Sequence, residues 1–93
     1  MIDPSPAELP IDGTLDLHTF DPRDVKDLVP DYLAACRGKG ILQVRIIHGK
    51  GIGTLQRTVS SLLERLPFVV SFHRADVTAG GWGATIVILR PEE

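Results

Sequence analysis

Apolar and polar residues alternate in short runs along the chain, and these runs predict four strands. Leu15 and Leu17 alternate with Asp16 and His18, so the two leucines would face a core and the two polar side chains the opposite side. Three further runs rich in apolar and β-branched residues, at 42–47, 68–74 and 84–89, predict the remaining strands.

Two segments between these runs carry apolar residues at spacings of three and four, which predicts helices. The first begins with Asp21 as N-cap and Pro22 in the first turn, and it ends at Gly38. The second covers Thr54–Leu66. Because a proline removes one backbone hydrogen bond, Pro30 predicts either a kink or two short helices in the first segment.

The element order β-α-β-α-β-β predicts an α/β fold. We expect a two-layer sandwich of two helices on a mixed, mostly parallel four-stranded sheet, with right-handed crossovers and one antiparallel hairpin. Residues 1–13 contain three prolines and predict an extended N-terminal arm, whereas residues 14–93 predict a single domain.

Length and composition fit one compact cytoplasmic domain. The chain has 93 residues, of which 43% are hydrophobic and 24% charged. Its longest uninterrupted apolar stretch, 84–89, is too short to span a membrane, and its acidic N-terminus is unlike a secretory signal. Cys36 is the only cysteine, so it predicts a buried core thiol and no intrachain disulfide.

Charge is segregated along the chain although the formal net charge is only -2. Residues 1–36 hold eight of the twelve acids, and residues 37–74 hold seven of the ten bases. Such asymmetry fits a surface for an anionic partner, and it also fits ordinary solvated faces.

The sequence HGKGIG, at residues 48–53, stands between a predicted strand and a predicted helix. Glycines at this position let backbone N–H groups approach an anion at a helix N-terminus, and Lys50 adds a positive charge. The segment matches neither the Walker A pattern nor the dinucleotide-binding pattern, which argues against nucleotide hydrolysis. We therefore expect a phosphate contact, with a simple tight loop as the alternative.

Four residues predict phosphodiester cleavage, because the ends of the first two strands should meet at one edge of a parallel sheet. His18 and His48 close those strands and could exchange protons with the attacking and leaving oxygens. Asp16 could orient a histidine, and Lys50 could stabilise charge on the phosphate. An RNA substrate would supply its own 2′-hydroxyl; DNA would need water and a divalent cation such as Mg²⁺, for which Asp16 and His18 are the candidate ligands.

Further residues around this edge are expected to contact nucleic acid. Trp82, flanked by glycines, could stack on a base or cap the core. The complete predicted binding set is Arg45, Gly49, Gly51, Gly53, Arg57, Gly81, Trp82 and Gly83.

Three ordered segments together resemble the signature blocks of the small MutS-related (Smr) domain family: LDLH at 15–18, IHGKGIGTL at 47–55 and GGWGAT at 80–85. The resemblance covers residues 14–90. It implies a fold like the C-terminal domain of bacterial translation initiation factor three, and nicking or endonuclease activity on DNA or RNA. The sequence departs from the family at Thr19, where Gly is frequent, and at Gln56, where Arg is common; Arg57 follows one residue later.

The leading hypothesis is a nicking endonuclease or ribonuclease that is a monomer or a weak oligomer. The first alternative is a nucleic-acid-binding module without turnover that uses the same glycine loop and basic residues. A second alternative is a protein-interaction domain whose acidic N-terminal half is the working surface.

Overall fold

The fold follows the predicted element order. The structure is a computed structural model that describes residues 11–17, 20–49, 54–75 and 83–92. In chain order the elements are β1 (Thr14–Asp16), α1 (Pro22–Gly38), β2 (Gln43–Ile47), α2 (Thr54–Arg65), β3 (Val69–Arg74) and β4 (Ala84–Leu89). The two helices and four strands confirm the α/β class.

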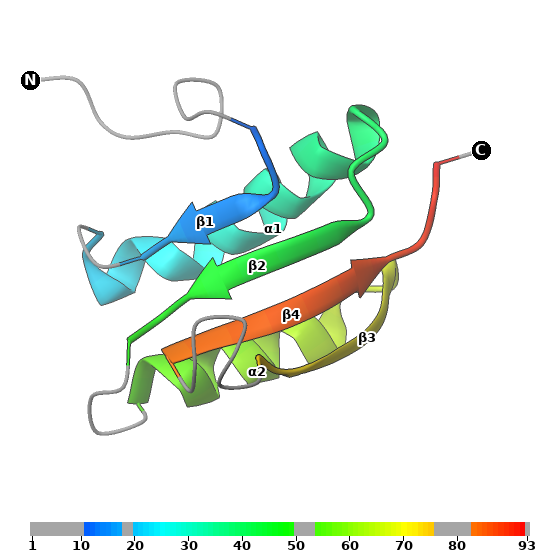
Figure 1. Cartoon of the computed structure of the whole chain (residues 1–93). Coiled ribbons are helices and arrows are strands. Elements are labelled where there is room, and N and C mark those ends of the chain that lie inside the picture. Colours follow the sequence, from blue (N-terminus) through cyan, green and yellow to red (C-terminus); the bar gives the residue numbers. More distant parts are fainter. Residues whose placement is uncertain (1–10, 18–19, 50–53, 76–82, 93) are drawn as a thin grey trace, which may run out of the picture.

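The four strands form one mixed sheet in the order β1-β2-β4-β3 (Figure 1). β1 and β2 are parallel, and β4 is antiparallel to both β2 and β3. Three strands therefore run in the same direction, and β3 and β4 form the expected antiparallel hairpin. Because β4 inserts between β2 and β3, β2 and β4 also pair in the antiparallel sense. The side chains explain this order: β4 is buried or half-buried along its whole length and suits a central position, whereas Ser71, His73 and Arg74 of β3 are exposed and suit an edge.

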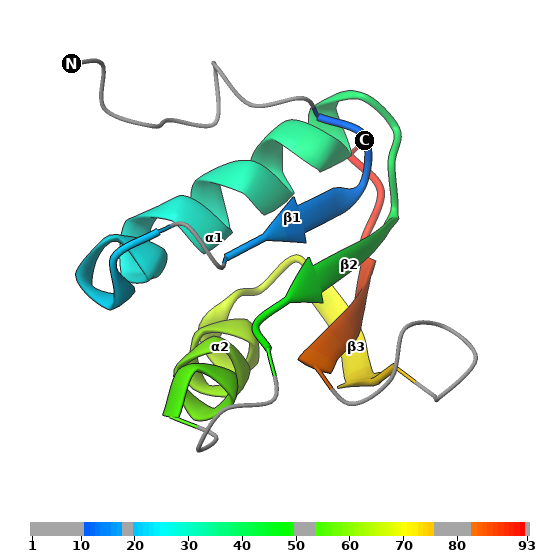
Figure 2. The same ribbon diagram turned by 60° about the vertical axis from the view of Figure 1, so that its left-hand side comes forward.

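Both helices cover the same face of the sheet, which gives the two predicted layers (Figures 1 and 2). The core lies between these layers and includes Leu15 and Leu17 from the β1 region, Ile46 from β2 and Val87 from β4. As expected, Asp16 is exposed while its two leucine neighbours are buried.

α1 is one continuous helix of 17 residues with Pro30 inside it, so the alternative of two short helices is wrong. Asp21 caps the helix through a 2.9 Å bond from the Arg23 N–H. Six buried side chains hold the helix against the sheet, and this burial compensates for the backbone bond that the proline lacks: Val25, Leu28, Val29, Tyr32, Leu33 and Cys36. Neither helix is long and apolar enough to cross a membrane, within the described residues.

The buried environment of α1 also keeps Cys36 inert. The thiol is fully buried, and burial raises its pKa, with a hydrogen bond from Tyr32 acting in the opposite direction. A raised pKa keeps the sulfur in its unreactive thiol form.

Residues 11–13, the end of the expected arm, lie against the domain. Ile11 packs on the core, the Tyr32 hydroxyl donates to Asp12 Oδ1 at 3.4 Å, and the Arg45 N–H donates to the Gly13 carbonyl at 2.8 Å. These contacts join the last part of the arm to β2 and α1.

Candidate functional site

The three sequence blocks meet at one edge of the sheet, at the arrowheads of β1 and β2 in Figure 1. Asp16 pairs with Ile47, and Ile47 pairs with Ala84 on the neighbouring strand. The Leu17 N–H extends this row by donating to the Ile47 carbonyl at 2.9 Å. Because β4 is antiparallel to β2, its first residues lie beside the last residues of β2, which in turn pair with the last residues of β1. The predicted shared edge is confirmed, and the third block joins it.

His48 follows β2 at this edge and is only 6% exposed. Its Nδ1 lies 3.0 Å from the Gly49 carbonyl oxygen, and its Nε2 lies 2.9 Å from the Thr85 hydroxyl. Thr85 is also buried, with 3% of its surface exposed. Both ring nitrogens are therefore hydrogen-bonded inside the protein.

These two partners define the tautomer of the His48 ring. A carbonyl oxygen only accepts hydrogen bonds, so Nδ1 must carry a proton to bond with Gly49. In the neutral ring Nε2 is then an acceptor, and the Thr85 hydroxyl donates to it. A proton could enter or leave at Nε2 only if the Thr85 hydroxyl turned to accept.

The start of the glycine loop is tied to the third block through one carbonyl. The backbone N–H groups of His48 and Gly49 both donate to the Gly83 oxygen, at 2.8 and 2.9 Å. Gly49 has a φ of 81°, a left-handed conformation that favours glycine. Gly83 and Gly49, both predicted to bind nucleic acid, are thus joined to each other, and the two N–H···O bonds from His48 and Gly49 to Gly83 fix where the chain leaves the sheet.

Asp16 and His48 lie on opposite faces of the sheet, although they share its edge. Successive strand residues point to opposite faces, and Asp16 pairs with Ile47 whereas Thr85 pairs with Ile46. Since His48 bonds to Thr85, its ring lies on the face covered by the helices, whereas Asp16 lies on the other face. The structure does not bring the Asp16 carboxylate to the His48 ring.

Several predicted residues fall outside the described ranges: His18, Lys50, Gly51, Gly53, Gly81 and Trp82. Their predicted roles in catalysis and binding therefore stay predictions. The same holds for Mg²⁺ at Asp16 and His18. Among residues 11–17, 20–49, 54–75 and 83–92, no three His, Cys, Asp or Glu side chains form a group that could hold a metal.

The described residues do not by themselves fit a magnesium site at this edge. Mg²⁺ prefers several oxygen ligands, and Asp16 is the only carboxylate of the described part of β1.

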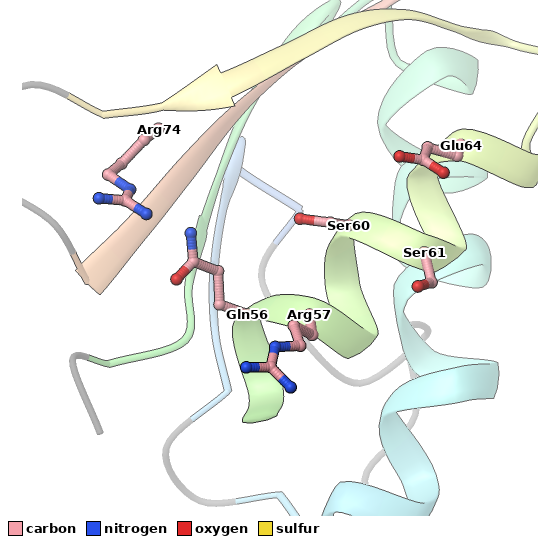
Figure 3. A pocket seen from close by; sticks show the side chains of 6 residues that line it. All are labelled: Gln56, Arg57, Ser60, Ser61, Glu64 and Arg74. Atoms are coloured by element: carbon pink, nitrogen blue, oxygen red, sulfur yellow. The ribbon is translucent and has the colours of Figure 1, made fainter. Parts of the chain in front are cut away.

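The two predicted arginines lie apart. Arg45 is half-buried on β2, on the face away from the helices, and its Nε is buried with no hydrogen-bond partner in the described part of the chain. Arg57 is exposed in the first turn of α2. The preceding residue, Gln56, is half-buried and extends toward Arg74 of β3, while Arg57 points away from Arg74 (Figure 3). The rotation of about 100° per helical residue accounts for this difference.

The sequence interpretation missed Thr85, the hydroxyl partner of His48. Thr85 lies in the GGWGAT block, but it was grouped with the apolar strand of residues 84–89. A hydroxyl on the buried face of an otherwise aliphatic strand needs a partner, and this was the available signal.

The domain is a two-layer α/β fold. At the carboxyl ends of its two parallel strands, a buried histidine begins a glycine-rich segment. The family model that matches is the Smr domain, over residues 15–90. The chain belongs to the Smr domain family.

Curated relatives support this assignment. The chain is 38% identical over 76 residues to Endonuclease MutS2 of Carboxydothermus hydrogenoformans, and 37% identical over 83 residues to Endonuclease MutS2 of Caldicellulosiruptor saccharolyticus. The alignments cover 82% and 89% of this chain. The chain spans about a tenth of the length of these relatives (10% in each alignment).

Solved structures agree with the fold. The Smr domain of Thermus thermophilus MutS2 matches with a TM-score of 0.79 and 35% identity, covering 84% of this chain and 98% of that one. YdaL, a stand-alone small MutS-related protein from Escherichia coli, matches with a TM-score of 0.77 and 28% identity, covering 87% of this chain and 66% of that one. The expected likeness to the initiation factor domain stays a prediction.

Proposed function

We propose that this chain is an endonuclease of the Smr type that cleaves phosphodiester bonds in DNA or RNA. One observation carries the proposal: Asp16, Ile47 and Ala84 form a continuous row, so that the three family blocks meet at one edge. The relatives named Endonuclease MutS2 support the same reaction class.

In this proposal the side chains at the edge have separate roles. Asp16 is exposed at the end of β1 and orients His18, which takes the proton from the attacking oxygen and gives it to the leaving oxygen as the phosphorus–oxygen bond breaks. Lys50 stabilises the negative charge that grows on the phosphate. His48 positions the glycine loop, because Thr85 and Gly49 occupy both of its ring nitrogens.

The nucleophile distinguishes the two substrates. RNA offers a 2′-hydroxyl next to each phosphate, so proton transfer by side chains is sufficient for cleavage. DNA lacks this group, so water must attack, and a divalent cation would assist it. Single-stranded RNA and supercoiled plasmid are therefore both needed as test substrates.

The test compares the parent with Asp16→Asn and His18→Ala on both substrates, with Mg²⁺ and with EDTA. We expect either substitution to lower the cleavage rate by about 100-fold or more, because a group that takes part in proton transfer typically contributes that factor. Asp31→Asn is the matched control, since Asp31 is an exposed carboxylate of α1. Equal rates for parent, Asp16→Asn and His18→Ala would refute the proposal.

A second candidate is a nucleic-acid-binding module without turnover. It is favoured by the burial of His48 and the engagement of both its ring nitrogens, which leave this imidazole no free group for proton transfer. It predicts salt-sensitive binding of DNA or RNA, because neutralised phosphates release counterions. Binding with no product on either substrate would favour it over the endonuclease.

A further inference from the structure

The outer surface of α2 carries a row of cationic and hydroxyl side chains that the edge does not use. Arg57, Ser61 and Arg65 follow one another at intervals of four residues, so they lie along one side of the helix. All three are exposed. At about 1.5 Å per residue, the two arginines are separated by about 12 Å along the helix axis.

Two hollows flank this row. One, of about 450 Å³, lies between α2 and β3 and includes Arg74; the other, of about 360 Å³, lies between α1 and α2 and includes Lys26. Arg57 and Ser61 line both hollows, so the row forms the ridge between them. Figure 3 shows Ser60 and Ser61 on α2 below Arg74, in the first hollow.

The charges of this surface are nearly all of one sign. Four cations line the two hollows, Lys26, Arg57, Arg65 and Arg74, and the single acid is Glu64. Within the described ranges, none of these side chains makes an ion pair or a side-chain hydrogen bond.

The arginines of α1 differ from those of α2 because they already have partners. Arg23 pairs with Asp21 at 3.2 Å. Arg37 donates to the Arg90 carbonyl at 2.7 Å and lies over the Phe68 ring. The cations of α2 therefore remain available to an anionic ligand.

The α2 surface begins near the candidate site, because α2 starts at Thr54, directly after the HGKGIG segment in the sequence. Arg57 is in the first turn of α2, and Arg74 pairs with Thr85, the partner of His48. We propose that the α2 surface, defined by Lys26, Arg57, Ser61, Arg65 and Arg74, binds the phosphate backbone of the nucleic-acid strand beyond the bond at the sheet edge. This inference rests on the proposed function.

The length and chemistry of the row fit this ligand. About 12 Å covers roughly three to four phosphates at the axial rise of about 3.4 Å per nucleotide in one DNA strand. Arginine forks and serine hydroxyls both donate to phosphate oxygens, and such contacts position a strand without reading its sequence. The surface therefore binds different sequences about equally.

The first test measures the affinity of the whole chain for fluorescein-labelled single-stranded and double-stranded oligonucleotides, as a function of salt. We expect Arg57→Gln with Arg65→Gln to weaken binding about tenfold or more. The slope of log affinity against log salt should fall by about one for each phosphate that the variant no longer neutralises. Lys39→Gln is the control, because Lys39 is an exposed cation at the far end of α1.

The outcomes separate this inference from the proposed function. A parent that binds and cleaves, with an α2 double variant of unchanged affinity and salt slope, overturns the inference alone. A parent that neither binds nor cleaves nucleic acid overturns both. An equal loss of affinity per removed charge in Lys39→Gln also contradicts the inference, because it would show that net charge alone controls binding.

A second test locates the strand directly. Ser61→Cys places a thiol on the ridge for a photo-crosslinker, and the natural Cys36 is buried, so the label stays on the new residue. We expect crosslinks to a labelled oligonucleotide from Ser61→Cys and none from Lys39→Cys. Equal crosslinking from both positions would overturn the inference.

Discussion

The two helices cover the same face of the sheet but differ in almost every other respect. α1 has 17 residues, buries six side chains and exposes acids such as Asp24, Asp27 and Asp31. α2 has 12 residues, buries only Val59 and Leu63, and exposes arginines. The helices also differ in charge: the three acids of α1 are balanced by Arg23, Lys26 and Arg37, whereas α2 has two arginines and one acid, Glu64.

This difference separates stability from ligand binding. The buried stripe of α1 removes much apolar surface from water, which makes α1 the main anchor of the fold. The basic surface of α2 contributes little to the core, so it can serve a ligand at little cost in stability.

The largest expected effect is on the anchor. Leu33→Ala in α1 should lower the free energy of unfolding by about 2–5 kcal/mol, because Leu33 is fully buried and its removal leaves a cavity. Leu62→Ala in α2 should lower it by about 1–2 kcal/mol, because Leu62 is only partly buried. Urea unfolding measures both, and equal losses would contradict the division between the helices.

The next largest effect concerns the buried, hydrogen-bonded pair of His48 and Thr85. Thr85→Val keeps the shape of the side chain but removes the donor to His48 Nε2, and a buried acceptor left unpaired costs about 1–3 kcal/mol. Thr85→Ser keeps the hydroxyl and should retain the bond. Urea unfolding gives the cost, and ¹⁵N spectra of the imidazole should show a proton on Nδ1. A proton on Nε2 alone would show that the assigned hydrogen bonds are wrong.

A smaller effect is expected at the start of α1. The hydrogen bond from the Arg23 side chain, followed by that from its backbone N–H, lowers the pKa of Asp21 below its usual 3.8. A lowered pKa means that the charged cap stabilises the fold above that value and that this contribution is lost as pH falls through the folded-state pKa. Asp21→Ala should lower the unfolding midpoint by about 2–5 °C near neutral pH, with the difference shrinking below pH 3.8.

Asp21→Asn is the matched control for this cap. Asparagine also caps helices but does not titrate, so this variant should keep most of the stability at neutral pH. Thermal unfolding monitored by circular dichroism at several pH values would decide. An unchanged difference between parent and Asp21→Ala in acid would contradict the assigned role of the Asp21 charge.

The smallest expected effect on stability is on α2. Arg57→Gln with Arg65→Gln should change the free energy of unfolding by less than about 0.5 kcal/mol, because both side chains are exposed and unpaired within the described residues. The same urea measurements apply. A loss of several kcal/mol would show that α2 depends on these arginines for folding.

Local patterns predicted the elements of the fold closely. The run of residues 84–89 is β4 to the residue, and α2 ends one residue before the predicted Leu66. The alternation around Asp16 correctly separated exposed from buried positions. The alternative of two short helices at Pro30 is wrong because the loss of one hydrogen bond is a local effect, whereas the burial that keeps α1 continuous depends on the whole apolar stripe.

The sheet order and the site geometry depend on contacts distant in sequence. Periodicity identifies β4 as a strand but does not say which strands flank it. For the same reason the sequence brought His48 and Asp16 to one edge but could not assign their faces. The face on which the His48 ring lies is set by its hydrogen bond to Thr85, which is 37 residues further along the chain.

The insertion of β4 has a consequence for how the domain is made. β4 is the last of the four strands in chain order, yet it alone joins β3 to β2. Before β4 has been synthesised, one edge of β2 is unpaired and β3 has no partner strand in the sheet. The sheet can close only once Ala84–Leu89 has emerged, so the nascent domain must avoid foreign edge pairing until that moment.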